Sequence, residues 1–514
     1  MRILLSLLFT LYTSHSTLFA ASTAKPNVVI IYTDDHRYSG VHALGGEAVQ
    51  TPHMDALSEE GVTFHNAYLM GSFSGATCIP SRATLLTGKS TFELHQPGKT
   101  IPPNHTTIGE AFQKAGYQTH IVGKWHQDYQ SLARSFDSGD TLMGLSAYLV
   151  DHYRMPLWDW NISGNYPKKD AYLLEYDKKG KVVRRSLNEK DKRGPTGTET
   201  LGPHTSEIFA DNAINYISKQ KRAKDPFFMY LAFHAPHDPR QAPAKYKAMY
   251  PESEIELPPS YARIHPFDNG HIVLRDEELA PWPRTPEIAR KELSDYYAII
   301  THLDTQIGRV IKSLKESGQY ENTLVVLCGD SGLAVGNHGL LGKQNVYDED
   351  GLHVPLIFAG GVIENKGDNS DALCYTHDIF PTICDMVGIE TPGSVSGHSF
   401  ARILKGKSSI HRKHTYHAYM QYQRAFRKGD YKLIEYVKAP GENKQDGPHI
   451  RGSRVTQLFN YKTDPWETVN LAYFPEYEEL IEEMRSQMKA EAKRLGDNKG
   501  ALINYDFDFW ESYK

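Results

Sequence analysis

Four nearly unbroken apolar runs, rich in β-branched and aromatic residues, recur along the chain. They occupy residues 27–32, 227–233, 323–328 and 354–359. Runs of this length, with no polar residue at alternate positions, predict strands that are buried on both faces, as in a parallel sheet. A further strand is predicted over residues 117–122.

Segments with helical periodicity separate these runs. Apolar residues spaced three or four apart predict helices over residues 107–115, 204–219 and 286–317. Strands that alternate with helices are typical of an α/β domain with helices on both faces of its sheet. We therefore expect a large, mixed, mostly parallel sheet sandwiched by helices.

The pattern changes beyond about residue 405. Shorter stretches with strand character follow one another closely, and a helix is predicted over about residues 476–494. We expect residues 405–514 to form a smaller C-terminal α+β subdomain. Its short antiparallel sheet would contain residues 415–421, 423–427, 431–437 and 457–461.

The N-terminus has the pattern of a secretory signal peptide. Arg2 precedes an apolar core at residues 3–12, and small residues follow at Ala20 and Ala21. This core is about half of the ~20 residues that span a bilayer. We expect a signal over residues 1–20, export to the periplasm or the medium, and no membrane contact after cleavage. A retained N-terminal anchor is the alternative.

Composition narrows the class of protein. The 514 residues are 40% hydrophobic and 23% charged, which is typical of a globular chain. A formal net charge of −5 gives no reason to expect nucleic acid as a partner. The chain has four cysteines, too few for a disulfide scaffold.

One short segment carries the main chemical signal. Residues 78–88 read CIPSRATLLTG. This segment resembles the sulfatase signature C-x-P-S-R-x-x-x-L-T-G at every fixed position. Over about residues 26–475 the chain is similar to the formylglycine-dependent sulfatases of the alkaline-phosphatase superfamily. The resemblance implies an alkaline-phosphatase-like catalytic domain over residues 21–404 and hydrolysis of sulfate esters.

The resemblance also implies a role for Cys78. A maturation enzyme would oxidise this residue to formylglycine (3-oxoalanine), and one hydroxyl of the aldehyde hydrate would attack sulfur. Pro80 suits the first turn of a helix, so Cys78 would lie at the positive end of the helix dipole, near Arg82. The alternative is a buried thiol at the start of a helix.

Candidate metal ligands follow two of the predicted strands. Asp34 and Asp35 come directly after one strand, and Asp330 and Ser331 follow another. The carboxylates and an oxygen of residue 78 would form a hard shell that favours Ca²⁺, with Mg²⁺ second. The family has Asn or His where this chain has Ser331, whose shorter side chain either ligates or leaves the position to water. The alternative to metal binding is that Asp34 and Asp35 simply form a turn or a helix cap at the end of the strand.

Three further motifs carry candidate catalytic side chains. The segment GKWH resembles the family's motif and implies that Lys124 holds the formylglycine hydrate while His126 acts as a base. The segment FHAPHDP implies that His237 is the general acid, with His234 as its competitor. Lys343 matches a sulfate-binding lysine, and His338 in the same loop is expected to support that loop.

The implied mechanism has two steps. One hydroxyl of the formylglycine hydrate displaces the alcohol, with His237 as acid. His126 then deprotonates the second hydroxyl, and inorganic sulfate leaves. Arg82, Lys124, Lys343 and the metal would stabilise the negative charge that develops. The rivals are a phosphate or phosphonate monoester hydrolase of the same superfamily and a non-catalytic protein that binds a sulfated glycan.

Two insertions bear on the substrate. Residues 131–203 are rich in Tyr, Trp, Lys and Gly, and residues 251–285 are rich in Pro; both are expected as loops at strand ends. Eight Lys and Arg residues between 178 and 193 form either a solvated hairpin, the more ordinary role, or a strip that binds a polyanionic glycan. By analogy the substrate would be a sulfated carbohydrate. Aromatic side chains that either stack on sugars or pack the insertion are Tyr153, Trp158, Trp160 and Tyr166.

Overall fold

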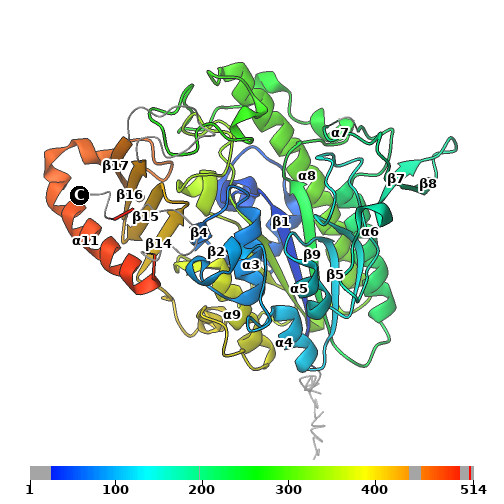
Figure 1. Ribbon diagram of the computed structural model, residues 1–514. Helices are drawn as coiled ribbons and strands as arrows, with labels where there is room; N and C mark the ends of the chain where they lie inside the picture. The colour runs from blue at the N-terminus through cyan, green and yellow to red at the C-terminus, as the bar shows by residue number, and fades with distance from the viewer. Residues whose placement is uncertain (1–24, 196, 439–452, 498–508, 511–514) are drawn as a thin grey trace, which may run out of the picture.

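The computed structural model describes residues 25–195, 197–438, 453–497 and 509–510. Its centre is an eight-stranded sheet, in which β1 (Asn27–Asp34) pairs in parallel with β9 (Phe227–Pro236) on one side and with β10 (Thr323–Gly329) on the other. Figure 1 shows β1 and β9 side by side. From edge to edge the strands are β12 (Asp368–Ser370), β2 (Val62–Phe64), β11 (Leu356–Ala359), β10 (Thr323–Gly329), β1 (Asn27–Asp34), β9 (Phe227–Pro236), β5 (Gln118–Lys124) and β6 (Ser138–Met143).

Alternation along β1 gives the sheet two buried faces. Val29 and Ile31 belong to one apolar core, and Val28 and Ile30 belong to the other. Helices close both cores, so the predicted mixed, mostly parallel sheet between helical layers is confirmed. The first core is covered by α2 (Pro52–Glu59), α6 (Thr205–Gln220) and α8 (Pro286–Glu316), and the second by α3 (Cys78–Thr87), α4 (Ile108–Lys114) and α9 (Ile379–Val387).

Two parts of the sheet differ from what the hydrophobic pattern predicts. Strand β11 runs antiparallel to β10, whereas a fully buried run predicts parallel pairing. Strand β6 lies within residues 131–203, expected to be loop, yet it pairs in parallel with β5 at the edge of the sheet. Its sequence, SGDTLM, begins with polar residues, which an edge strand tolerates because part of it faces solvent.

The C-terminal sheet is antiparallel, as expected, but it takes one strand from the N-terminal part of the chain. The two-residue strand β4 (Gly71–Ser72) pairs in parallel with β14 (His414–Tyr419). The apolar core beneath the sheet likewise combines Phe73 and Tyr347 with Leu433 and Met484. The remaining elements of this part are β14 (His414–Tyr419), β15 (Gln423–Lys428), β16 (Tyr431–Lys438), β17 (Ser453–Asn460) and α11 (Glu478–Leu495).

A two-stranded hairpin, formed by β7 (Tyr172–Tyr176) and β8 (Val182–Ser186), projects from the body of the molecule on the right of Figure 1. Shorter elements complete the fold: β3 (Ala67–Tyr68), β7 (Tyr172–Tyr176), β8 (Val182–Ser186), β13 (Cys374–Tyr375), α1 (His42–Gly45), α5 (Tyr129–Ser135), α7 (Ala244–Lys247) and α10 (Ala401–Leu404).

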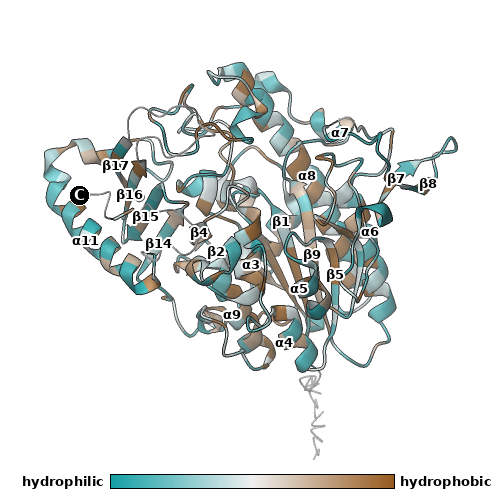
Figure 2. Cartoon of the chain, viewed as in Figure 1, coloured by the Kyte–Doolittle hydropathy of each residue, from teal (hydrophilic) through white to brown (hydrophobic). Residues whose placement is uncertain are grey.

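Hydropathy follows the layers, with hydrophobic strands at the centre and hydrophilic outer helix faces (Figure 2). Among the described residues, no helix combines the length and the apolar character needed to cross a membrane. The predicted signal peptide, residues 1–20, lies outside the described residues.

Candidate active site

The carboxyl ends of β1 and β10 place three carboxylates side by side. Asp34 is the last residue of β1, and Asp330 follows β10, where its backbone N–H donates to the Thr33 carbonyl at 2.9 Å. The Asp35 N–H donates to Asp330 Oδ1 at 2.9 Å. The Ser331 hydroxyl lies 3.2 Å from Asp35 Oδ1 and 3.3 Å from Asp330 Oδ1. All of these side chains are buried.

Three cationic side chains face this acidic group. Lys124 Nζ contacts Asp34 Oδ2, and Lys343 Nζ contacts Asp35 Oδ1. Arg82, on α3, lies 3.1 Å from Asp330 Oδ2 and 3.4 Å from Asp34 Oδ2. Burial opposes ionisation of Asp34, yet Lys124 and Arg82 hold its pKa well below the usual value. Burial and then the charge of Asp34 raise the pKa of Asp330 to about 7.

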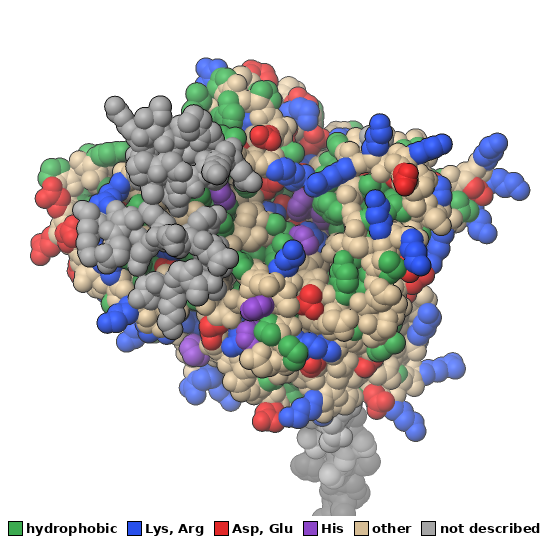
Figure 3. Space-filling model, viewed as in Figure 1, with side chains coloured by type: hydrophobic (Ala, Val, Ile, Leu, Met, Phe, Trp, Pro, Cys, Tyr) green, Lys and Arg blue, Asp and Glu red, His purple; other side chains and the backbone are tan. Residues whose placement is uncertain are grey.

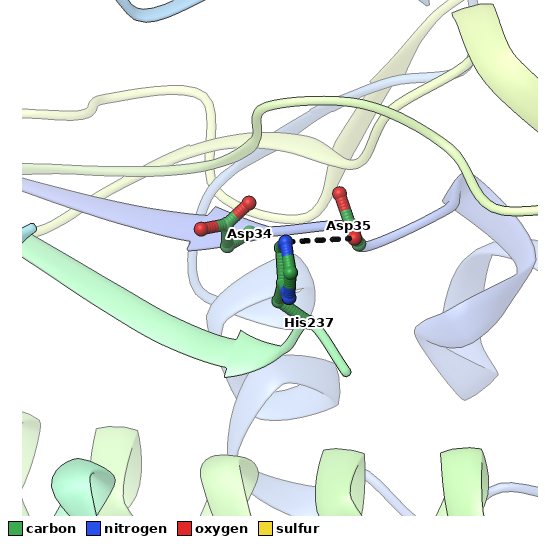
Figure 4. Close-up of side chains that lie close together, drawn as sticks. All are labelled: Asp34, Asp35 and His237. Atoms are coloured by element: carbon green, nitrogen blue, oxygen red, sulfur yellow. Dashed lines mark ion pairs between the residues drawn. The ribbon is translucent and has the colours of Figure 1, made fainter. Parts of the chain in front are cut away.

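The donor set fits a hard divalent cation. Asp34 Oδ1 is buried and has no hydrogen-bond partner among the described residues. A buried carboxylate oxygen needs a partner, and a bound cation would supply one. Ligand atoms of Asp34, Cys78 and Asp330 lie within 4.8 Å of one another, as do those of Asp34, Asp35 and His237. Figure 4 shows the second group, with His237 Nε2 3.9 Å from Asp35 Oδ2. Oxygen ligands of this kind suit Ca²⁺ or Mg²⁺.

Cys78 is the first residue of α3 and lies beside this acidic group. Its Sγ atom is 3.3 Å from His126 Nδ1 and 3.8 Å from Lys124 Nζ. Burial raises the pKa of the Cys78 thiol to about 11, although Lys124 acts in the opposite direction. An unmodified Cys78 is therefore a neutral thiol, and its Sγ marks the place that formylglycine oxygens would take.

The three histidines near Cys78 have different environments. Burial and then Lys124 lower the pKa of His126 well below its usual value, so this ring is neutral. His234 is fully buried, and its two nitrogens contact Asp34 Oδ2 at 3.3 Å and the Tyr148 hydroxyl at 2.8 Å. His237 Nδ1 lies 2.7 Å from the Asp238 carbonyl, and its ring reaches the wall of a cavity.

That cavity, about 520 Å³ in volume, opens over Cys78. Figure 3 shows histidine side chains within a hollow of this face, with Lys and Arg side chains around it. Its volume is within the range of small-molecule sites. The predicted catalytic residues that line it are Cys78, Lys124, His126, His237 and Lys343. Side chains from the two insertions complete the wall: Tyr148, Arg193, Leu274, Arg275 and Asp276.

Among these wall residues, sequence reasoning singled out neither Tyr148 nor Arg275. Tyr148 is hydrogen-bonded to His234, and the Arg275 guanidinium pairs with both carboxylate oxygens of Asp238, which follows His237. Asp238 lies inside the FHAPHDP segment, so the sequence motif could have identified it. Tyr148 and Arg275 lie in loops without periodicity, so no local signal marks them.

The aromatic residues singled out in the first insertion pack rather than line the cavity. Trp158 and Tyr166 are 1% and 2% exposed and belong to the second core, with Trp160 packed against it. The Trp158 Nε1–H donates to the Pro167 carbonyl at 3.2 Å. Of the two alternatives for these side chains, packing of the insertion against the domain is the one that the structure supports.

His338 lies outside the cavity wall. Its Nδ1 is 2.7 Å from Asp350 Oδ2, its Nε2 is 3.1 Å from the Glu467 carbonyl, and its ring stacks on Tyr347 at 3.8 Å between centroids. These contacts hold the loop that leads to Lys343.

Known sulfatases match the chain over most of its length. The sulfatase family model matches residues 26–389, and the model for the C-terminal part of N-sulphoglucosamine sulphohydrolase matches residues 336–494. The chain belongs to the sulfatase family of enzymes, which confirms the family predicted from the signature at residues 78–88.

Individual relatives and solved structures are similar to this chain over most of its length. An N-acetylglucosamine-6-O-sulfatase of Bacteroides thetaiotaomicron is 26% identical, over 93% of this chain and 88% of its own. A solved structure of a protein in complex with its substrate D-glucosamine-2-N,6-O-disulfate has a TM-score of 0.70 and 23% identity over 93% of this chain and all of its own. A phosphonate monoester hydrolase of Agrobacterium radiobacter has a TM-score of 0.68 and 19% identity, over 92% and 96%. At these identities the two structures support the fold alone.

Proposed function

We propose that this chain hydrolyses O-sulfate esters of a sulfated carbohydrate through a formylglycine at position 78. The observation that carries the proposal is the position of Cys78, at the start of α3, in the wall of the cavity and 3.3 Å from a neutral histidine. The name of the Bacteroides relative, an N-acetylglucosamine-6-O-sulfatase, supports a sugar as the substrate. Export through a signal over residues 1–20 belongs to the same proposal.

Two groups would complete the site. A maturation enzyme would convert Cys78 to formylglycine, whose hydrate supplies the attacking hydroxyl. A Ca²⁺ ion, with Mg²⁺ as the second choice, would be held by Asp34, Asp35, Asp330 and, with its shorter side chain, Ser331. Bound there, it would supply positive charge for the sulfate oxygens. The unpartnered oxygen of Asp34 supports this assignment.

The remaining side chains would move protons and balance charge. His126 is neutral and its Nδ1 faces the position of the nucleophile, so it would accept a proton there. His237 reaches the cavity and would donate a proton to the leaving oxygen. Arg82, Lys124 and Lys343 would stabilise the charge that develops on the sulfate oxygens as the ester bond breaks.

Replacement of Cys78 tests the proposal directly. We expect Cys78→Ala to lose sulfate release from aryl and sugar sulfates by at least about a thousandfold, because the other groups only assist a nucleophile. The matched control is Cys384→Ala, since Cys384 is a buried thiol on α9, outside the cavity wall. Sulfate release is measured after co-expression with a maturation enzyme, and the mass of the Cys78 peptide shows whether conversion took place.

The outcomes separate the alternatives. Undiminished sulfate release by Cys78→Ala would reject the mechanism. Faster release of phosphate than of sulfate from matched aryl esters would favour the phosphate or phosphonate hydrolase. An unmodified thiol in a wild-type protein that binds sulfated sugars without turnover would favour the binding protein.

A further inference from the structure

The cavity wall holds two arginines in different electrostatic states. Arg275 is neutralised, because it pairs with both oxygens of Asp238 and lies 3.0 Å from Asp276 Oδ1. Arg193, by contrast, has no ion pair within the described residues. Its guanidinium carbon lies 5.9 Å from the centroid of the Tyr148 ring, and its side chain is solvent-accessible.

Arg193 is separate from the rest of the basic run in which it occurs. Most of residues 178–193 belong to the β7–β8 hairpin, which points away from the body of the molecule (Figure 1). Arg184 pairs with Asp159 at 2.6 Å, and Arg185 pairs with Glu175 at 2.7 Å. The solvated-hairpin interpretation therefore holds for most of the run, while Arg193 alone among these residues lines the cavity.

The backbone next to Arg193 is anchored to the segment that carries Tyr148. The next residue, Gly194, donates its backbone N–H to the Leu149 carbonyl at 2.8 Å, which ties the Arg193 segment to the segment that carries Tyr148. The Tyr148 hydroxyl is in turn 2.8 Å from His234, which contacts Asp34. A chain of contacts thus runs from the carboxylates of the reaction centre to the guanidinium at the wall.

The ion pairs of the basic side chains in the cavity wall indicate what Arg193 can bind. Within the cavity wall, Lys124 and Lys343 contact the carboxylates of Asp34 and Asp35, so their charges are already opposed. Arg193 contributes a positive charge without a carboxylate partner among the described residues. A guanidinium offers a planar pair of donors that matches a carboxylate or a sulfate. The cavity therefore offers a second anion position besides the one over Cys78.

We propose that Arg193 is a specificity residue that binds a second anionic group, a carboxylate or a sulfate, of the sugar whose sulfate ester lies at Cys78. The proposal rests on the proposed sulfatase function. It assigns the substrate to the class of sulfated sugars with two anionic groups, as distinct from neutral sugars with a single sulfate. Tyr148 acts here as the surface on which the guanidinium is held.

The test compares three substrate classes across a small set of variants. The substrates are a monosulfated neutral sugar, a disulfated sugar and a sulfated uronic acid, so that sulfate and carboxylate are separated as the second anion. The variants are Arg193→Ala, Arg193→Lys and the matched control Lys192→Ala. Lys192 is the exposed neighbour and lies outside the cavity wall. The readouts are kcat and KM for sulfate release.

We expect Arg193→Ala to lower kcat/KM about tenfold to a hundredfold for whichever two-anion substrate is preferred, mainly through KM. The loss on the monosulfated sugar should be about threefold or less. Arg193→Lys should restore part of the difference, because it keeps the charge and loses the paired donors. Lys192→Ala should resemble the wild type. Equal losses on all three substrates, or none, would overturn the assignment.

Binding separates this proposal from the proposed function. In the Cys78→Ala background, calorimetry with the same sugars measures whether Arg193→Ala weakens the two-anion ligands selectively. A wild-type enzyme without sulfate release would reject the sulfatase proposal, while the ratio of dissociation constants would still decide the role of Arg193. A ratio unchanged by Arg193→Ala would reject the second anion position.

Discussion

His234 and His237 lie three residues apart at the end of β9, and their ring centroids are 4.6 Å apart. Both belong to the FHAPHDP segment, so sequence alone left either of them as the general acid. Their surroundings differ, because His234 is enclosed with both nitrogens engaged and His237 reaches the cavity wall. Of the two histidines, His237 is the one that lines the cavity in which a leaving group would lie, so the structure favours His237 as the general acid.

We expect His237→Gln to slow release of a sugar alcohol by about 10² to 10⁴ in kcat, the usual contribution of general acid catalysis. The loss should be much smaller for an aryl sulfate with an acidic phenol, because that leaving group departs without a proton. The measurement is the ratio of kcat values for the two substrates. His234→Gln is the matched comparison and should slow both substrates alike. The reverse pattern would assign the acid to His234.

Residues of the site differ in how far sequence could predict them. Asp34, Asp330 and the GKWH residues follow predicted strands, and parallel strands bring their carboxyl ends to one edge, so their proximity follows from the topology. Tyr148 and Arg275 lie in long loops without periodicity, and the basic run of residues 178–193 does not show that Arg193 is the member that lines the cavity. Their positions depend on how those loops pack, and no local pattern encodes that packing.

At the scale of elements, side chains of the C-terminal part of the chain contact the loop that follows β10 and fix its position. Lys432 on β16 contacts Asp348 and lies 2.8 Å from Glu467 Oε1. Glu467 also accepts a hydrogen bond from the Asp348 backbone N–H at 2.7 Å and offers its carbonyl to His338. Because Lys343 lies between His338 and Asp348, the C-terminal sheet positions a residue of the cavity wall.

The ion pair of His338 with Asp350 predicts a pH dependence of stability. Burial acts against the charged ring, but Asp350 and then Glu467 outweigh it and raise the pKa of His338. A raised folded-state pKa means that protonation stabilises the fold. This contribution is complete below the unfolded value of about 6.5 and is lost as pH rises through the higher folded value.

Replacement by glutamine should remove that dependence. We expect the Tm difference between wild type and His338→Gln to be largest below about pH 6 and to shrink at alkaline pH. Scanning calorimetry at a series of pH values measures it. His42→Gln, at an exposed site, should show no such trend. A difference that grows toward alkaline pH would contradict the assigned role.

The central sheet shows which strands the hydrophobic pattern predicts and which features of the strands it does not predict. The apolar runs of β1, β9 and β10 predict strands buried on both faces, and these form its centre. Strand direction is a property of connections rather than of composition, so the antiparallel β11 was not predicted. Strand β4, two residues long, carries no detectable period.

At the scale of the whole molecule, we propose two units, residues 21–404 and 405–514. They are bound tightly together, because β4 completes the C-terminal sheet and Phe73 and Tyr347 lie in the core below it. The family model over residues 336–494 also crosses the proposed boundary. The first unit should therefore depend on the second for its fold.

A chain that ends at residue 404 tests this dependence. We expect it to accumulate in the insoluble fraction and to release no sulfate, because the apolar side chains around Phe73 and Tyr347 would lose their cover and β4 its partner strand. The control replaces residues 177–181, the tip of the β7–β8 hairpin, with an Asn-Gly turn, and should remain soluble and active. Solubility, circular dichroism and sulfate release are measured on both. A soluble shortened chain with cooperative unfolding would show that residues 21–404 fold independently. If that chain also released sulfate, the contacts between β16 and the loop that carries Lys343 would not be needed for activity.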